Sequence, residues 1–398
     1  MKCLFNLSHI SAGFVAVLVG YTSSAVIIFQ AAASAGAGPA EISSWLWALG
    51  IGMALTSIGL SLRYKTPVLT AWSTPGAALL VTGLSGLSLN EAVGVFLFSS
   101  ALITLCGITG WFERLMRHIP SPLAAAMLAG VLLQFGLQLF GALQHQLLLV
   151  AAMLVCYLVV RQLLPRYVIP VTLLIGLLIA TGQGLLQVEV LSWQLARPVW
   201  VMPEFSITAL IGVGIPLFIV TMASQNIPGL AVLRANGYDT PASPLITGTG
   251  LTGLLLAPFG GFAFNLAAIT AAICMGREAD PDPARRYMAT VWAGFFYLLT
   301  GLFGATVAAL FAAFPAELVM AIAGLALLGT IGNSLGAALH DSDSREAALI
   351  TFLVTASGIT LAGVGSAFWG LAAGLLGYHL PKLITTVRSA GLSARSEP

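Results

Sequence analysis

Residues 67–83 read PVLTAWSTPGAALLVTG, and this stretch decides the fold. A short strand-like run ends in Ser73-Thr74-Pro75-Gly76, and a run of small apolar residues follows. A Ser or Thr hydroxyl before a proline is typical of a helix start, with the hydroxyl as N-cap and the ring in the first turn, where no donor is lost. The stretch therefore predicts a short strand followed by a half-helix.

A second stretch, PFGGFAFNLAAITAAIC at residues 258–274, has the same organisation. Gly260-Gly261 precedes the strand-like Phe262-Ala263-Phe264, and Asn265 is the expected cap of a second half-helix. Each break alone is equally consistent with a kinked helix or an interhelical hydrogen bond. Their corresponding positions in the two halves of the chain instead indicate a transporter binding site. Two half-helices entering from opposite directions would point free N–H groups and positive dipole ends at one midplane site, which favours an anion.

The composition around these stretches is that of a membrane protein. Of 398 residues, 58% are apolar and 8% are charged, against roughly 25% charged in soluble domains. The basic residues are scattered, which excludes a nucleic-acid partner. We find no metal-ligand spacing, no nucleophile or phosphate-loop motif and no carboxylate pair within an apolar stretch, so we expect no metal, no cofactor, no catalytic residue and no enzyme activity.

Apolar stretches of membrane length predict fourteen transmembrane segments, with the lipid bilayer as surroundings. Their ranges are 11–33, 41–62, 68–86, 91–112, 120–140, 146–164, 167–187, 206–227, 243–257, 261–276, 287–310, 315–338, 347–363 and 366–385. With the N-terminus inside, every one of the 16 basic residues except Arg197 lies in a cytoplasmic loop. This asymmetry predicts cytoplasmic N- and C-termini and a multi-pass protein of the bacterial inner membrane.

The long loop 188–205 divides the segments into two sets of seven, and an odd number per set requires an inverted repeat. We expect a first repeat at 1–190, a periplasmic linker at 191–205 and an inverted second repeat at 206–398. Ala71-Trp72-Ser73 then corresponds to Ala263-Phe264-Asn265. The expected fold is an all-α polytopic membrane protein with a short strand plus a half-helix in segments 3 and 10.

The interior of the predicted segments holds neutral polar groups, with no acidic or basic residue at a segment centre. A cationic substrate would lack a counter-charge there, whereas a monovalent anion or weak acid would not be repelled. Aromatic residues near the breaks suit an apolar ring, although core packing and interhelical hydrogen bonds are the ordinary alternatives. The candidate substrate-binding residues are Ser23, Ser24, Trp72, Ser73, Thr74, Gly76, Gln225, Asn226, Phe264 and Asn265.

Several phrases make the chain resemble the benzoate/proton symporter (BenE-like) family over nearly its whole length. They include TAWSTPGAALLVTG, PLAAAMLAGVLLQFG, PLFIVTMASQN and TASGITLAGVGSAFWGL. That family is similar to uracil/xanthine and sulfate-type anion transporters. The resemblance implies a core domain of segments 1–4 and 8–11, a gate domain of segments 5–7 and 12–14, a substrate held between segments 3 and 10 beside segment 8, and a homodimer through the gate.

The resemblance also carries a departure. In the nucleobase relatives, acidic residues on segments 8 and 10 bind substrate and handle protons, and here Gln225 and Asn265 stand at the matching positions. An uncharged pocket suits benzoate or a related aromatic carboxylate, imported by alternating access. Proton symport is implied by the family alone, and the proton carrier is unidentified. An anion channel and a nucleobase-type transporter remain the alternatives.

Overall fold

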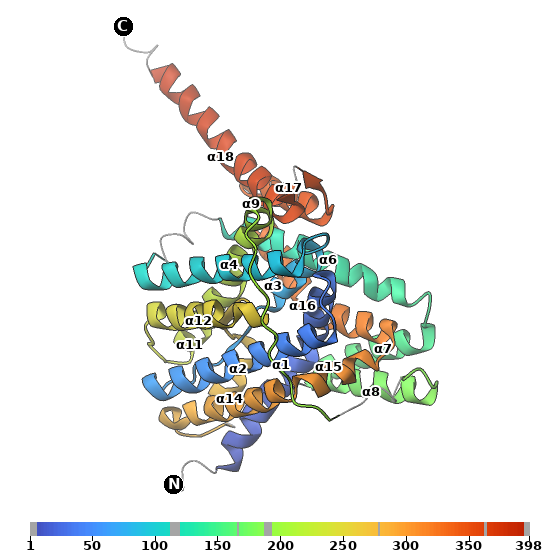
Figure 1. Cartoon of the computed structure of the whole chain (residues 1–398). Coiled ribbons are helices and arrows are strands. Elements are labelled where there is room, and N and C mark those ends of the chain that lie inside the picture. The colour runs from blue at the N-terminus through green and yellow to red at the C-terminus, as the bar shows by residue number, and fades with distance from the viewer. Residues whose placement is uncertain are drawn as a thin grey trace.

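The computed structural model describes residues 6–111, 120–164, 167–186, 193–277, 279–361 and 364–393. Its backbone is mostly helical (Figure 1), and the last helix projects away from the others. The elements of the first half are α1 (Leu7–Ser34), α2 (Pro39–Tyr64), β1 (Thr70–Trp72), α3 (Thr74–Gly83), α4 (Leu89–Thr109), α6 (Ser121–Ala142), α7 (Leu147–Leu163) and α8 (Val168–Gly182).

In the second half, a strand followed by a short helix, β2 and α13, again lies among longer helices, and two further short strands precede the last helix. Its elements are α9 (Ile207–Ala209), η3 (Leu210–Gly214), α10 (Ile215–Thr221), η4 (Met222–Asn226), α11 (Ile227–Ala235), α12 (Ala242–Leu256), η5 (Ala257–Phe259), β2 (Phe264–Leu266), α13 (Ile269–Met275), η6 (Pro283–Arg285), α14 (Tyr287–Leu302), α15 (Gly304–Ala312), α16 (Ala316–Leu339), α17 (Arg345–Ala356), β3 (Thr360–Leu361), β4 (Val364–Gly365) and α18 (Ser366–Ser393).

Each apolar stretch expected to span the membrane coincides with a helix or with a strand followed by a helix. Among the described residues, six helices are by themselves long and apolar enough to cross a bilayer, or up to eight if two bent pairs count as single spans. Several of the other expected segments are short; α3 has 10 residues and α13 has 7. The fourteen-segment count and the inverted repeat stay predictions with which this architecture is compatible.

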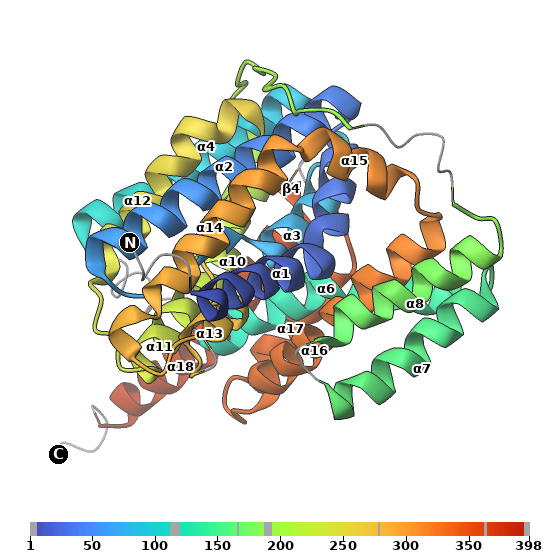
Figure 2. The same ribbon diagram turned by 90° about the horizontal axis from the view of Figure 1, so that it is seen from below.

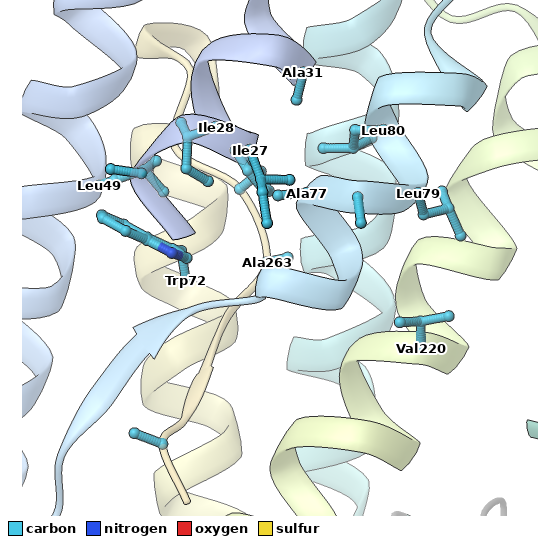
Figure 3. Packing of buried hydrophobic residues seen from close by; sticks show 14 of the residues in the cluster. Ile27, Ile28, Ala31, Leu49, Trp72, Ala77, Leu79, Leu80, Val220 and Ala263 are labelled. Atoms are coloured by element: carbon cyan, nitrogen blue, oxygen red, sulfur yellow. The ribbon is translucent and has the colours of Figure 1, made fainter. Parts of the chain in front are cut away.

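The two strands expected in segments 3 and 10 pair with each other. β1 and β2 are antiparallel, with Ala71 opposite Asn265 and Trp72 opposite Phe264. The ladder continues beyond the strands, because the Ser73 N–H donates to the Ala263 carbonyl at 3.1 Å. Segments 190 residues apart thereby satisfy each other's backbone in the apolar interior, as non-helical backbone there requires. Figure 3 shows β1 running into α3 beside Trp72 and Ala263.

The expected start of the second half-helix at Asn265 is wrong. Strand β2 occupies Phe264–Leu266, two residues later than the expected strand, and α13 begins only at Ile269, with Ala268 as an N-cap that contributes no side-chain bond. The physical reason is the pairing with β1, which holds Asn265 in extended backbone opposite Ala71. The capping propensity of Asn265 depends on its neighbours in the chain, and it takes no account of pairing with a strand from the other half of the chain.

The helices pack in two groups. In one group α2 lies against α14 and α4 against α12, while in the other α6 lies against α16 and α17. Small residues permit the close approach: a Cβ added to Gly50 of α2 would lie 2.5 Å from the Gly301 Cα of α14, and one added to Gly130 of α6 would lie 2.8 Å from the Phe352 carbonyl of α17. Such contacts are typical of helix interfaces in membranes.

The described part of the long central loop, residues 193–206, runs in extended form across helix ends of the first group (Figure 1). The Ala196 N–H donates to the Leu302 carbonyl at 2.8 Å and the Glu204 N–H to the Asn90 carbonyl at 2.9 Å. This loop therefore holds the ends of α14 and α4, in addition to connecting the two halves.

Candidate functional site

A cavity of about 980 Å³ lies between the two groups of helices and contains the ends of both half-helices. Figure 2 shows α1, α3 and α13 on one side of this region and α6, α8 and α16 on the other. We call these sides the first wall and the second wall. The lining residues of the first wall are Val19, Gly20, Ser24, Met53, Ala71, Trp72, Thr74, Pro75, Val220, Ala223, Ser224, Gln225, Ile227, Pro228, Ala267, Ala268, Ile269, Thr270, Ile273 and Tyr297. The lining residues of the second wall are Ser121, Ala124, Ala125, Leu128, Val168, Ile169, Pro170, Ala326, Leu327, Thr330, Asn333, Ser334 and Ala337.

The start of α3 has the cap that the sequence predicts. The Ser73 hydroxyl accepts the Gly76 N–H at 3.0 Å, and the Ser73 carbonyl accepts the Ala77 N–H at 2.7 Å. Ser73 is fully buried in this role, whereas Thr74 and Pro75 line the cavity. Gly76 lies away from the cavity, because a Cβ there would be 2.8 Å from the Leu217 side chain. Ser73 and Gly76 thus shape the half-helix, and Thr74 is the polar group it presents.

Trp72 and Ser24 form a hydrogen-bonded pair in the first wall. The Trp72 indole N–H donates to the Ser24 hydroxyl at 2.8 Å, and that hydroxyl donates to the Gly20 carbonyl at 2.8 Å. The Trp72 ring also meets Tyr21 edge-to-face, with ring centroids 4.7 Å apart. The indole is therefore held in a fixed orientation with part of its surface on the cavity. The Ser23 side chain lies outside the described residues.

Segment 8 widens into a π-helix, η4, at the cavity wall. Single π turns are frequent at functional sites. Ser224 and Gln225 line the cavity, and the Ser224 hydroxyl donates to the Val220 carbonyl. Within the described part of the chain, the Gln225 amide has no hydrogen-bond partner. Asn226 turns the other way, is fully buried, and accepts the Leu266 N–H at 3.0 Å, so that it joins η4 to β2.

The last two candidates, Phe264 and Asn265, lie behind the cavity. Phe264 is buried against α2, where a Cβ on Gly52 would be 2.4 Å from its ring. The Asn265 amide N–H donates to the Ala263 carbonyl at 3.0 Å, and its Oδ1 is buried without a partner among the described residues. Both residues support the strand pair, and Thr270 of α13 is the polar residue of this segment that lines the cavity.

Backbone donors also lie at the start of α13. The N–H groups of Ile269, Thr270 and Ala271 have no acceptor within the described residues, as expected for a helix start without a side-chain cap. Ile269 and Thr270 belong to the cavity wall. Segment 10 therefore does have an N–H-rich helix start, with its N-cap three residues beyond the expected Asn265.

The second wall contributes polar residues that the sequence reasoning missed. Ser121 lies at the start of α6, and Thr330, Asn333 and Ser334 follow one face of α16. Their spacing of i, i+3 and i+4 within segment 315–338 indicates a polar face in the sequence itself, because these positions share one side of a helix. The cavity wall as described contains no Asp, Glu, Lys, Arg or His side chain, and the described residues hold no cluster of metal-ligating groups.

A hydrophobic, mostly helical chain with an uncharged polar cavity between two helix groups has the architecture of a membrane transport protein. The chain belongs to the BenE family, whose model is described as benzoate membrane transport protein and matches residues 3–380. This is a family of transporters and not of enzymes. The family expected from the sequence phrases is therefore confirmed.

Two relatives match over almost their whole length. The chain is 54% identical over 373 residues to the inner membrane protein YdcO of Escherichia coli (strain K12), covering 94% of this chain and 95% of that protein. It is 44% identical over 380 residues to the benzoate membrane transport protein of Acinetobacter baylyi (strain ATCC 33305 / BD413 / ADP1), covering 96% of both chains.

Solved structures share the fold. The transmembrane domain of the cyanobacterial bicarbonate transporter BicA matches with a TM-score of 0.60 at 13% identity, over 93% of this chain and 97% of that one. The murine anion transporter Slc26a9, in an inward-facing state, matches with a TM-score of 0.59 at 11% identity, over 96% of this chain and 69% of that one. At these identities the likeness establishes the fold that this chain shares with anion transporters.

Proposed function

We propose that this protein is a secondary active transporter that imports benzoate or a related aromatic carboxylate across the bacterial inner membrane. The observation that carries the proposal is the cavity of about 980 Å³, which combines apolar surface with uncharged hydrogen-bond donors at two half-helices. The A. baylyi relative, named a benzoate membrane transport protein, supports this substrate class. The name of YdcO, an inner membrane protein, supports the location.

In this proposal the substrate carboxylate lies among Thr74, Gln225 and Thr270, where donors face the cavity and no acidic side chain repels it. The aromatic ring packs on Trp72, whose orientation is fixed by Ser24. The other candidate residues act by holding the backbone of the site in place; they are Ser73, Gly76, Asn226, Phe264 and Asn265. Ser23 adjoins Ser24 on α1.

Alternating access would move a core domain, segments 1–4 and 8–11, against a gate domain, segments 5–7 and 12–14. The distribution of the cavity residues supports this division, because the first wall comes from the proposed core and the second wall from the proposed gate. The repeats at 1–190 and 206–398, the linker at 191–205 and a homodimer through the gate belong to the same proposal. Symport of a proton would supply the driving force for accumulation.

The test is uptake of labelled benzoate by proteoliposomes under an inward proton gradient. We expect saturable uptake that unlabelled benzoate competes away, accumulation above the external concentration, and loss of accumulation when an uncoupler collapses the gradient. An absence of saturable uptake would refute the substrate. Large currents without accumulation would indicate the channel alternative, and competition by uracil but not by benzoate would indicate the nucleobase alternative.

A further inference from the structure

The second wall carries a polar cluster that an unsubstituted benzoate leaves without a partner. Thr330, Asn333 and Ser334 lie on one face of α16 and line the cavity. Leu327 precedes them on the same face and Ala337 follows them, so the cluster is a local polar patch within an otherwise apolar stripe. Within the described part of the chain, neither the Asn333 amide nor the Thr330 hydroxyl has a hydrogen-bond partner.

This cluster is separate from the groups assigned to the carboxylate. Thr74, Gln225 and Thr270 belong to the first wall, whereas the cluster belongs to the second. Benzoate has polar atoms at one end only, and its ring offers no hydrogen-bond partner to an amide or a hydroxyl. A substrate in contact with both walls would therefore displace water from the cluster without replacing the lost hydrogen bonds, which costs binding free energy.

A ring with a second polar group removes this mismatch. Asn333 can both donate and accept a hydrogen bond, and Thr330 can do the same through its hydroxyl. A neutral hydroxyl on the ring suits two neutral partners, whereas a second carboxylate would meet no cation among the lining residues described. The cavity, at about 980 Å³, is at the upper end of the size range for small-molecule sites and has room for such a substituent.

We propose that Asn333, assisted by Thr330, is a specificity-determining residue that binds a hydroxyl substituent of the aromatic ring, and that hydroxylated benzoates are substrates. The inference rests on the proposed function, since the carboxylate end is the one described there. Asn333 is exposed in this structure, so a substrate hydroxyl would replace water on its amide, whereas a ring without that hydroxyl would cover the amide and leave it unpaired.

The test titrates benzoate, 3-hydroxybenzoate and 4-hydroxybenzoate separately into the purified protein and measures the affinity of each directly by calorimetry. We expect the wild-type protein to bind at least one hydroxybenzoate more tightly than benzoate. Asn333→Leu, which keeps the side-chain volume, should weaken that hydroxybenzoate by about tenfold and leave benzoate within about twofold. Thr330→Val should act in the same direction to a smaller extent.

Gly332→Ala is the matched control, because it changes the neighbouring residue of α16 where an added Cβ meets nothing within 4 Å. It should leave both affinities unchanged. Equal weakening of benzoate and hydroxybenzoate by Asn333→Leu, or no effect on either, would overturn the specificity role. A wild-type protein that binds hydroxybenzoates but not benzoate would support the specificity role and exclude benzoate itself from the proposed substrate class. If it binds neither, both proposals fail.

Discussion

The Gln225 side chain is a neutral amide in a cavity whose described lining residues carry no charge. It lies in the cavity wall and has no hydrogen-bond partner within the described residues. A carboxylate there would face the substrate carboxylate across a cavity that holds no compensating basic side chain among its described lining residues. Two like charges within one cavity repel each other, and this repulsion is stronger where the local dielectric constant is below that of water.

Gln225→Glu should therefore weaken benzoate binding by tenfold or more at pH 7, and the loss should be smaller at pH 5, where a glutamate takes up a proton more readily. Gln225→Ala removes the amide without adding charge and should cost less, with no such pH dependence. Competition binding at the two pH values measures both effects. Equal losses for the two variants would exclude charge repulsion at this site.

His9 and Asp280 form a buried pair outside the cavity. The His9 Nε2 lies 2.8 Å from the Asp280 Oδ2 and ties the start of α1 to the loop between α13 and α14. In the same loop, Arg286 donates to the Asp280 carbonyl and to the Met275 carbonyl, each at 2.8 Å. Burial by itself would raise the pKa of Asp280, but the Asp282 N–H, the His9 ring and Arg285 together lower that pKa below its ordinary value.

A lowered pKa in the folded state means that ionised Asp280 stabilises the protein above the ordinary carboxyl pKa, and that this stability is lost as the pH falls through the lowered value. Wild-type protein should thus lose stability on acidification below about pH 4, in part through this group. Asp280→Asn should lower the melting temperature at pH 7, and its deficit should shrink at acid pH. Asp239→Asn, at an exposed position, is the control; a deficit independent of pH would contradict the assignment.

The strand pair and the π-helix η4 depend on each other through Asn226. Its Oδ1 accepts the Leu266 N–H at 3.0 Å in a fully buried position, so η4 and β2 share one hydrogen bond that neither element can replace internally. Because η4 also presents Ser224 and Gln225 to the cavity, this bond links the stability of two elements to the geometry of the site.

Asn226→Leu keeps the side-chain volume but leaves the Leu266 N–H unpaired, which costs about 1–3 kcal/mol. We expect a lower melting temperature in detergent and reduced benzoate uptake at equal protein amounts. Asn236→Leu is the control, because Asn236 is an exposed residue after the end of α11. Wild-type stability and uptake in Asn226→Leu would show that the bond contributes nothing.

At the scale of the whole molecule, the cavity has lining residues that lie near one set of loops. Ser121, Val168, Pro228, Ile273 and Ala337 line it and lie close in the sequence to basic loops, which the charge asymmetry assigns to the cytoplasm. On the opposite side η3 packs against β4 and α18, and α3 packs against α6, so that the two walls meet there. In the proposed cycle we therefore expect substrate to reach the cavity from the cytoplasm.

A cysteine in place of the exposed cavity-lining residue Ala337 tests this expectation in a variant without the native cysteines. Ala337→Cys should react with a membrane-impermeant maleimide from the cytoplasmic side of oriented vesicles, and benzoate should slow the reaction. Ser85→Cys, in the exposed loop between α3 and α4, should react from the opposite side. Reaction of both cysteines from the same side would refute the orientation.

Much of the fold follows from local sequence. Ser73 caps α3 as predicted, because the hydroxyl, the proline and the glycine that define this start are adjacent in the chain. The uncharged interior and the broken segments also follow from residues a short distance apart. Asn265 could not be placed in this way, since its conformation depends on the strand around Ala71, far away in the sequence.

The sequence by itself determined that this is a membrane protein, where its helices break, and that its interior suits an anion, because charge, hydropathy and capping act over a few residues. Only the tertiary structure decided which polar groups face the cavity. Gln225 and Asn226 are neighbours, yet one lines the cavity and the other holds β2. Asn333 entered the site because α16 packs across from the half-helices. Such choices depend on contacts between distant segments, which no local pattern records.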